Sequence, residues 1–169
     1  MSPATNDISL IGLLAAAALL PFLVAVGTCY IKFTVVFTLV RNAMGLQQVP
    51  SNMVINGISL MLAFFVMQPI ILGLQESYAA LDAAPATLSQ IGEFLDSSLG
   101  AYRAYLAKYS DPELLRFFHH AQSPGEITVE QLDPQDRSLL ELLPSYALSE
   151  LKDAFLMGFY LYLPFVVVD

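Results

Sequence analysis

Three long stretches without a charged side chain constrain the fold of this sequence more than any other feature. They cover residues 8–31, 42–75 and 154–168. A helix of about 20 predominantly apolar residues is long enough to cross the hydrocarbon core of a bilayer. The hydrophobic fraction of 56% also exceeds the roughly 45–50% that is usual in soluble domains. The pattern predicts an all-α membrane protein.

The charges missing from these runs are gathered in residues 76–153, which hold thirteen acidic and five basic side chains and account for the formal net charge of −8. A region this acidic has no basic surface to neutralise phosphates, so we expect no nucleic-acid partner. Basic residues favour cytoplasmic loops, and Arg41 lies at the end of an apolar run. We therefore expect the turn after Arg41 inside the cell and the acidic region on the periplasmic side.

A polar turn connects the first two apolar runs. We expect one long helical segment over residues 8–40, bent at Pro21, because proline removes a backbone hydrogen bond and kinks a helix interior. Since this length exceeds the roughly 20 residues that cross a bilayer, either part of it lies outside the hydrocarbon layer or the helix is broken. Gly45 can terminate this helix, and Pro50 with the polar residues after it can start the next one, over residues 53–74. Two apolar helices joined by a short turn predict a helical hairpin.

Lys32 is the charged residue within the body of this hairpin. A charge at the centre of a membrane helix costs about 2.5–3.5 kcal/mol on insertion scales. We therefore expect Lys32 to face a partner helix, a carboxylate or water rather than lipid.

The acidic region is expected to be helical as well. Apolar residues recur at spacings of three and four over residues 88–109, which is typical of an amphipathic helix. Residues 110–113, SDPE, can start a short helix through Ala121, with a capping side chain, an early proline and an acid in the first turn. Residues 122–137, rich in proline, glycine and acidic residues, predict a loop.

A third apolar helix is expected to start at Pro144 and to be interrupted by Pro164. Because the sequence ends at Asp169, within a hydrophobic run, we expect a C-terminal hairpin to be truncated. Three regions follow from these patterns: an N-terminal hydrophobic hairpin over residues 1–75, an acidic helical extracytoplasmic region over 76–143, and the start of a third hydrophobic helix over 144–169.

The sequence gives no indication of catalysis. His119 and His120 are adjacent, whereas two metal ligands on one helix prefer a spacing of four, so we expect exposure or local hydrogen bonding. Asp133 and Asp136 lie in a loop without apolar walls that would shift a pKa. The single cysteine, Cys29, allows no internal disulfide. The sequence contains no phosphate-binding loop, GxSxG or HExxH motif. We expect no enzyme, no metal and no cofactor.

Three segments resemble the SctR/FliP family, the core export-apparatus proteins of bacterial type III secretion systems and flagella. They are RNAMGLQQVPSN, FFVMQP and LLPSYALSELKDAFLMGFYLYLPFVVVD. The resemblance covers both ends of the chain and leaves the middle variable. The segments GTCYIKFTVVF and GLQQVPSN are most similar to invasion-type injectisome members.

This resemblance implies a function without chemistry. It implies a pentamer in the bacterial inner membrane, joined by SctS- and SctT-type subunits in a closed cone. Unfolded substrate proteins would pass through its central pore, and the inner rod and needle proteins would build upon it. A small-solute transporter is the alternative, although it would need its own substrate site and often an internal repeat. A membrane enzyme is the third class, for which the sequence shows no reactive constellation.

Nine residues are candidates for assembly contacts. Lys32 is a candidate for an ion pair with an acidic residue on a neighbouring copy or a partner. Residues of the hairpin turn would fix the turn and hydrogen-bond across subunits, and three charges near residue 150 would form intersubunit pairs. The competing account is a solvated turn and weak ion pairs on a helix surface. The candidates are Lys32, Arg41, Asn42, Gln47, Gln48, Asn52, Glu150, Lys152 and Asp153.

Overall fold

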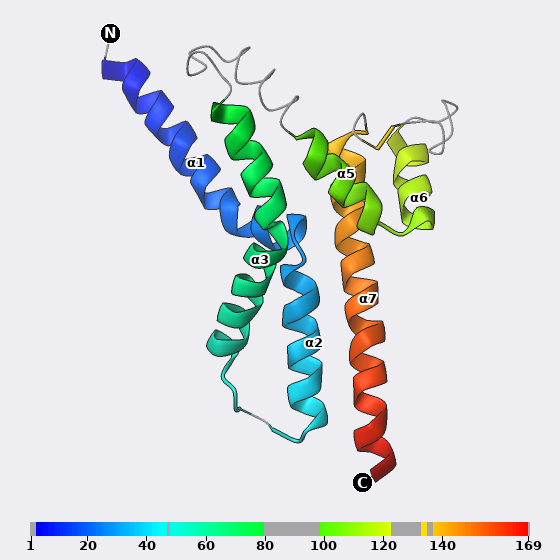
Figure 1. The fold of residues 1–169 in the computed structure, drawn as a ribbon. Helices are drawn as coiled ribbons and strands as arrows, with labels where there is room; N and C mark the ends of the chain where they lie inside the picture. Colours follow the sequence, from blue (N-terminus) through cyan, green and yellow to red (C-terminus); the bar gives the residue numbers. More distant parts are fainter. Residues whose placement is uncertain (1–2, 47, 80–98, 123–132, 135–136, 169) are drawn as a thin grey trace.

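A computed structural model describes residues 3–46, 48–79, 99–122, 133–134 and 137–168 (Figure 1). Every regular element within these residues is a helix, as the sequence predicts. In chain order the helices are α1 (Pro3–Gly27), α2 (Tyr30–Ala43), α3 (Asn52–Ala79), α5 (Gly100–Tyr109), α6 (Pro112–Gln122) and α7 (Leu139–Val168).

The helices form two regions, which we call the stem and the head. The stem consists of α2, α3 and residues 151–168 of α7, with α2 packed against α7 on one side and α3 on the other (Figure 1). The head consists of α5, α6 and residues 139–150 of α7. Helix α1 leaves the top of the stem, beside α3, and touches the rest of the chain near its C-terminal end. The long helix α7 therefore belongs to both regions.

The head closes a small apolar core of its own. Side chains from α5, α6 and α7 are fully or almost fully buried there, namely Leu106, Leu115, Leu142 and Tyr146. The hydroxyl of Tyr105 lies 3.0 Å from that of Tyr146, so a polar pair completes the core. At the start of α6, the Asp111 side chain accepts a 2.8 Å hydrogen bond from the Glu113 backbone N–H. This N-cap confirms the predicted start of the short helix.

Helix α7 begins earlier than expected and does not stop where expected. It starts at Leu139, five residues before Pro144, and continues through Pro164 to Val168. The hydroxyl of Ser138 accepts a hydrogen bond from the Leu140 backbone N–H and caps the helix. Leu142 and its neighbours also bury their side chains in the head. The cap and the packing outweigh the cost of Pro144, which lies in the second turn of the helix and removes one helical hydrogen bond.

The expected helical segment over residues 8–40, bent at Pro21, is instead broken into two helices. Helix α1 runs through Pro21 as far as Gly27, and the chain breaks at Thr28 and Cys29 before α2. The Thr28 hydroxyl donates a 2.6 Å hydrogen bond to the Val24 carbonyl and accepts one from the Tyr30 backbone N–H. A side chain that binds nearby backbone groups competes with helical hydrogen bonding, which places the break here rather than at the proline.

The hairpin between α2 and α3 is present. Gly45 adopts a positive φ of 70°, which only glycine adopts without strain. Its N–H binds the Asn42 carbonyl, and the Leu46 N–H binds the Arg41 carbonyl. These two bonds form a Schellman motif, the glycine-dependent helix end that the sequence predicts.

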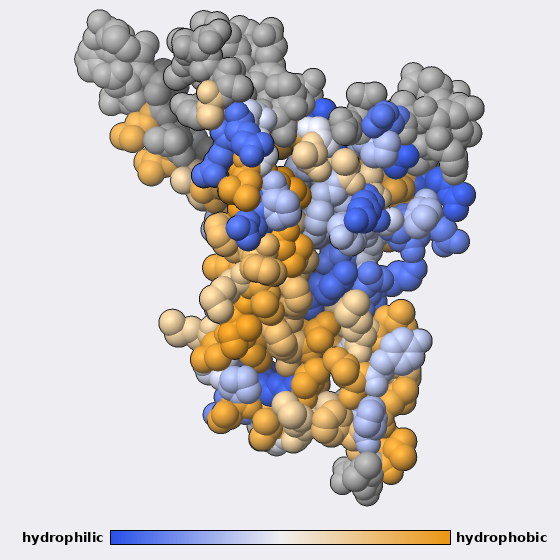
Figure 2. All heavy atoms as spheres, viewed as in Figure 1, coloured by the Kyte–Doolittle hydropathy of each residue, from blue (hydrophilic) through white to orange (hydrophobic). Residues whose placement is uncertain are grey.

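Apolar side chains cover the surface of the stem, whereas the head is largely hydrophilic (Figure 2). Within the described residues, two segments are long and apolar enough to cross a membrane, Leu10–Gly27 and Asn52–Ser77. The apolar half of α7 is not one of them. Much of the expected amphipathic helix and of the predicted loop lies outside the described residues, which resume at residue 99 and omit 123–132.

Candidate functional site

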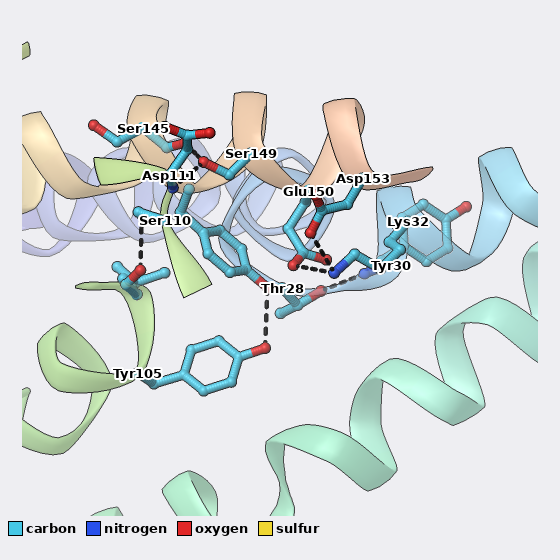
Figure 3. Close-up of polar contacts among 12 residues, drawn as sticks. Thr28, Tyr30, Lys32, Tyr105, Ser110, Asp111, Ser145, Ser149, Glu150 and Asp153 are labelled. Carbon is cyan, nitrogen blue, oxygen red and sulfur yellow. Dashed lines mark hydrogen bonds and ion pairs between the residues drawn. The ribbon is translucent and has the colours of Figure 1, made fainter. Parts of the chain in front are cut away.

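A cluster of charges joins α2 of the stem to α7 at the boundary between stem and head. The Lys32 Nζ lies 2.7 Å from the Glu150 Oε1 and 3.5 Å from the Asp153 Oδ2. In Figure 3 the lysine points from α2 towards both carboxylates on α7. The two acids are three residues apart and therefore share one face of the helix. The lysine faces carboxylates, in agreement with the expectation from its position in an apolar helix.

Close helix packing allows this contact. Gly158 lies two turns beyond Glu150, and a Cβ atom added there would collide with the side chain of Leu39 on α2. The absence of a side chain lets α2 and α7 approach closely. Along α7, the ion cluster lies between the contact of Gly158 with Leu39 and the apolar core of the head, and both hold it in place.

Burial makes the Lys32–Glu150 pair costly to disturb. The Glu150 side chain is only 2% exposed, whereas Asp153 is 46% exposed. The second carboxylate oxygen of Glu150, Oε2, is buried and has no hydrogen-bond partner among the described residues. Removing one member of a buried ion pair typically costs about 3–5 kcal/mol, because an uncompensated charge remains. The cluster thus specifies how α2 and α7 pack.

A second polar chain joins the head to α7. The Ser149 hydroxyl accepts a 2.6 Å hydrogen bond from the Asp111 N–H and donates one to the Ser145 carbonyl. The Asp111 carboxylate pairs with Lys152 at the surface. The hydrogen bond from Lys152 holds the pKa of Asp111 below its ordinary value. Serine is small, so the corner between α5 and α6 packs closely against α7.

The hairpin turn is held by Arg41. Its guanidinium Nη1 donates to the Pro50 carbonyl at 3.1 Å and to the Asn52 Oδ1 at 2.7 Å. The Asn52 side chain therefore binds the arginine at the base of the turn. Asn42 and Gln48 are exposed, and Gln47 lies outside the described residues. Arg41 thus fixes the turn from within the chain.

The structure pairs the candidate charges with other residues of the same chain. Lys32, Glu150 and Asp153 contact one another within one chain, and Lys152 contacts Asp111. A single chain thus supplies the acidic groups that the sequence analysis sought on a neighbouring copy. Lys152 lies outside the cluster, on another side of α7.

Sequence reasoning missed three contacts that hold the head to the stem or to itself. The Tyr102 hydroxyl donates a 2.7 Å hydrogen bond to the Gly27 carbonyl, and burial raises the pKa of Tyr102 to about 12. The His119 Nδ1 on α6 lies 2.9 Å from the Oε2 of Glu141 on α7, 22 residues away, whereas the sequence analysis expected exposure or local hydrogen bonding. The serine chain on α7 is the third. Only the i, i+4 spacing of Ser145 and Ser149 could have indicated it.

The described residues do not form a metal site, because they contain no group of three or more His, Cys, Asp or Glu side chains that could hold an ion. The cluster between α2 and α7 is an internal salt link with a packed glycine beside it. Its chemistry is structural: it orients two apolar helices whose other faces remain open. The fold and site therefore define a helical protein with two candidate membrane-spanning helices among the described residues.

The family is defined by a match that covers nearly the whole chain. The FliP family model matches residues 13–169, and this chain belongs to the FliP family. The chain is 56% identical to the surface presentation of antigens protein SpaP of Shigella flexneri, over 97% of this chain and 76% of that protein. It is 35% identical to the Yop proteins translocation protein R of Yersinia pestis and 38% identical to the hypersensitivity response secretion protein HrcR of Ralstonia nicotianae. These matches cover 97% and 95% of this chain and 76% and 75% of the relatives.

Proposed function

We propose that this component of a type III secretion export apparatus is a structural subunit of its protein-conducting pore. It would carry unfolded substrate proteins across the bacterial inner membrane and perform no chemistry itself. Family membership supports the apparatus. The names of relatives, which refer to translocation and secretion, support protein as the cargo.

The observation that carries this proposal is the amount of apolar surface that one chain leaves open. Large apolar side chains of the described stem are exposed, among them Phe65 (71%) on α3 and Phe159 (57%) on α7. The described part of α3 buries only one stripe of residues with a spacing of four, namely Ile55, Ser59, Ala63 and Met67. Lipid and other subunits would cover the rest of the stem.

The proposed assembly is a pentamer of this chain with SctS- and SctT-type subunits, in contact with the inner rod and needle proteins. The head carries the acidic side chains and would lie on the periplasmic side. The region boundaries at residues 75 and 143 remain part of this proposal. The internal cluster and Arg41 would give each copy the rigid shape that a ring requires. The exposed Asn42 and Gln48 would contact neighbouring subunits, and Gln47, which lies outside the described residues, stays a candidate from the sequence.

Native mass spectrometry tests this function. The full-length protein is co-expressed with its neighbouring membrane subunits and extracted in detergent. We expect a discrete complex that contains five copies of this chain and the smaller partners, and we expect secretion to fail when the gene is deleted. A monomer or dimer that recruits no partner would contradict the proposal and favour a small-solute transporter.

A further inference from the structure

Helices α1 and α2 are separated by a break of only two residues, and its backbone stays close to helical. We call residues 27–30 the joint. Cys29 has φ −69° and ψ 11°, so its φ is that of an α-helix and only its ψ departs from the usual value of about −42°. No glycine or proline occurs from Thr28 to Ala43. A helix without interruption across the joint is therefore sterically available to this sequence.

Two side-chain hydrogen bonds occupy backbone groups of the joint that a continuous helix would use. The Thr28 hydroxyl accepts a 3.3 Å hydrogen bond from the Tyr30 N–H, which in a continuous helix would bind the carbonyl four residues earlier. The Tyr102 hydroxyl donates to the Gly27 carbonyl at 2.7 Å, and this carbonyl is the helical acceptor for the Ile31 N–H. Each case exchanges one neutral hydrogen bond for another, so hydrogen bonding alone favours neither form strongly.

The second of these contacts comes from the head. Tyr102 lies on α5, and a Cβ atom added to Gly27 would collide with its hydroxyl. Glycine at position 27 therefore makes room for the tyrosine. One turn further along α5, Leu106 is fully buried in the core of the head. The position of Tyr102 at the joint thus follows the position of the head.

Helix α1 has few contacts that would oppose a change in its direction. All its residues between positions 10 and 24 whose burial is described are exposed within the chain. It touches the rest of the chain near its C-terminal end (Figure 1). A hollow of about 540 Å³, with Leu23, Phe64 and Tyr102 among its lining residues, lies between α1, α3 and α5. The direction of α1 is therefore set mainly at the joint.

We propose that the joint is a two-state element controlled by the head. While Tyr102 binds the Gly27 carbonyl, α1 and α2 are two helices. When α5 moves away, the Ile31 N–H binds that carbonyl and the two helices become one. A movement of the head thus changes the direction of α1, which contains the candidate membrane span Leu10–Gly27. This inference goes beyond the proposed function and does not depend on it.

Amide hydrogen exchange at single-residue resolution, on the full-length protein in detergent, tests the joint. In the broken form the Ile31 N–H belongs to the first turn of α2, where a helix leaves N–H groups without a backbone partner. Tyr102→Phe keeps the ring and removes the hydroxyl, so we expect exchange at Ile31 to slow at least fivefold. A purely structural contact predicts the opposite, because its loss would loosen the joint. Faster or unchanged exchange at Ile31 would overturn the proposal.

Two controls accompany this variant. Tyr109→Phe removes the hydroxyl of an exposed tyrosine on the same helix and should leave exchange at Ile31 unchanged. Protection of the Leu106 and Leu142 amides in the head should match the parent in both variants, which shows that the head remains folded.

Gly27→Ala provides an independent readout, because its methyl group would displace the Tyr102 hydroxyl. Spin labels are attached at Leu14→Cys on α1 and Met44→Cys at the end of α2, both of which are exposed sites. Cys29→Ala is present in every sample, the parent included. In one continuous helix the two labelled positions lie about 45 Å apart at 1.5 Å per residue, and the break brings them closer together.

We expect Gly27→Ala to move the measured distance distribution towards the value for a continuous helix. The matched control is Gly12→Ala, at a position of α1 where an added Cβ meets nothing within 4 Å, and it should leave the distribution as in the parent. A distribution for Gly27→Ala that is identical to that of the parent would show that Tyr102 does not decide between the two forms, and would overturn the proposal.

Discussion

The head buries an apolar core within one chain, whereas the stem leaves many of its large apolar side chains exposed. The head packs within one chain: its three helices bury one apolar core, and the hydroxyls of Tyr105 and Tyr146 pair with each other. In the stem, α3 buries one stripe of residues and no residue of α2 is fully buried, while large side chains such as Phe65 and Phe159 remain open. A region that packs within one chain can hold its shape alone, whereas the described stem leaves many of its large apolar side chains uncovered by the chain.

The two regions meet at a charged contact within the chain. A close ion pair joins Lys32 on α2 of the stem to Glu150, the last residue of the head on α7. Fixing α2 against α7 sets the distance between the exposed apolar faces of α3 and α7. A stem without this link would present its neighbours with a variable surface. The link between α2 and α7 is thus the place where the two regions depend on each other.

The largest expected effect comes from Lys32. Replacement by methionine leaves Glu150 buried and uncompensated, so we expect a loss of about 3–5 kcal/mol in unfolding free energy and loss of the assembled complex. Denaturant unfolding in detergent and native mass spectrometry measure the two effects. Lys32→Arg should retain most of both.

The double variant Lys32→Met/Glu150→Met separates charge from packing. Because apolar residues of similar volume often replace a buried ion pair without loss, stability should return to near the parent value. A double variant as unstable as the single one would show that the pair matters for more than compensation of charge.

The next largest effect tests whether the head stands alone. Leu106 is fully buried in the head, and Leu106→Ala should cost about 2–5 kcal/mol by loss of transfer energy and creation of a cavity. Hydrogen exchange should show lost protection in α5, α6 and the first half of α7, with α2 and α3 protected as before. Uniform loss of protection across the stem would mean that the two regions unfold as one. Leu140→Ala, at an exposed site on α7, is the control.

Gly158 gives an intermediate effect on the stem. Gly158→Ala places a methyl group against Leu39, and overpacking of this kind costs about 1–3 kcal/mol. Leu39→Ala in the same chain should recover part of the loss by making room. Gly57→Ala is the matched control and should be neutral or slightly stabilising for the monomer, as measured by thermal unfolding in detergent. A tolerated Gly158→Ala would contradict the close approach of α2 and α7.

Apolar runs and turn residues were sufficient to predict the hairpin, because they act locally. Gly45 ends α2 by a motif that depends on its own φ angle. The sequence was misleading where distant packing decides: α7 starts at Leu139 because the head buries its first turns, not at Pro144. The site was half predictable. Lys32, Glu150 and Asp153 could each be recognised as unusual, but their pairing within one chain depends on how α2 and α7 pack, which no single element encodes.

The smallest expected effect is the pH dependence of the Asp111–Lys152 pair, which joins the head to α7 at the surface. The lysine lowers the pKa of Asp111 in the folded protein, so the pair stabilises the fold above the unfolded-state pKa of about 4. That contribution is lost as pH falls through the lowered pKa. Thermal unfolding of Lys152→Met should differ from the parent at neutral pH and converge with it below about pH 4. Lys108→Met, on α5, controls for loss of a surface charge. If the difference persisted in acid, Lys152 would act through packing of its alkyl chain, and the surface link between head and stem would not be electrostatic.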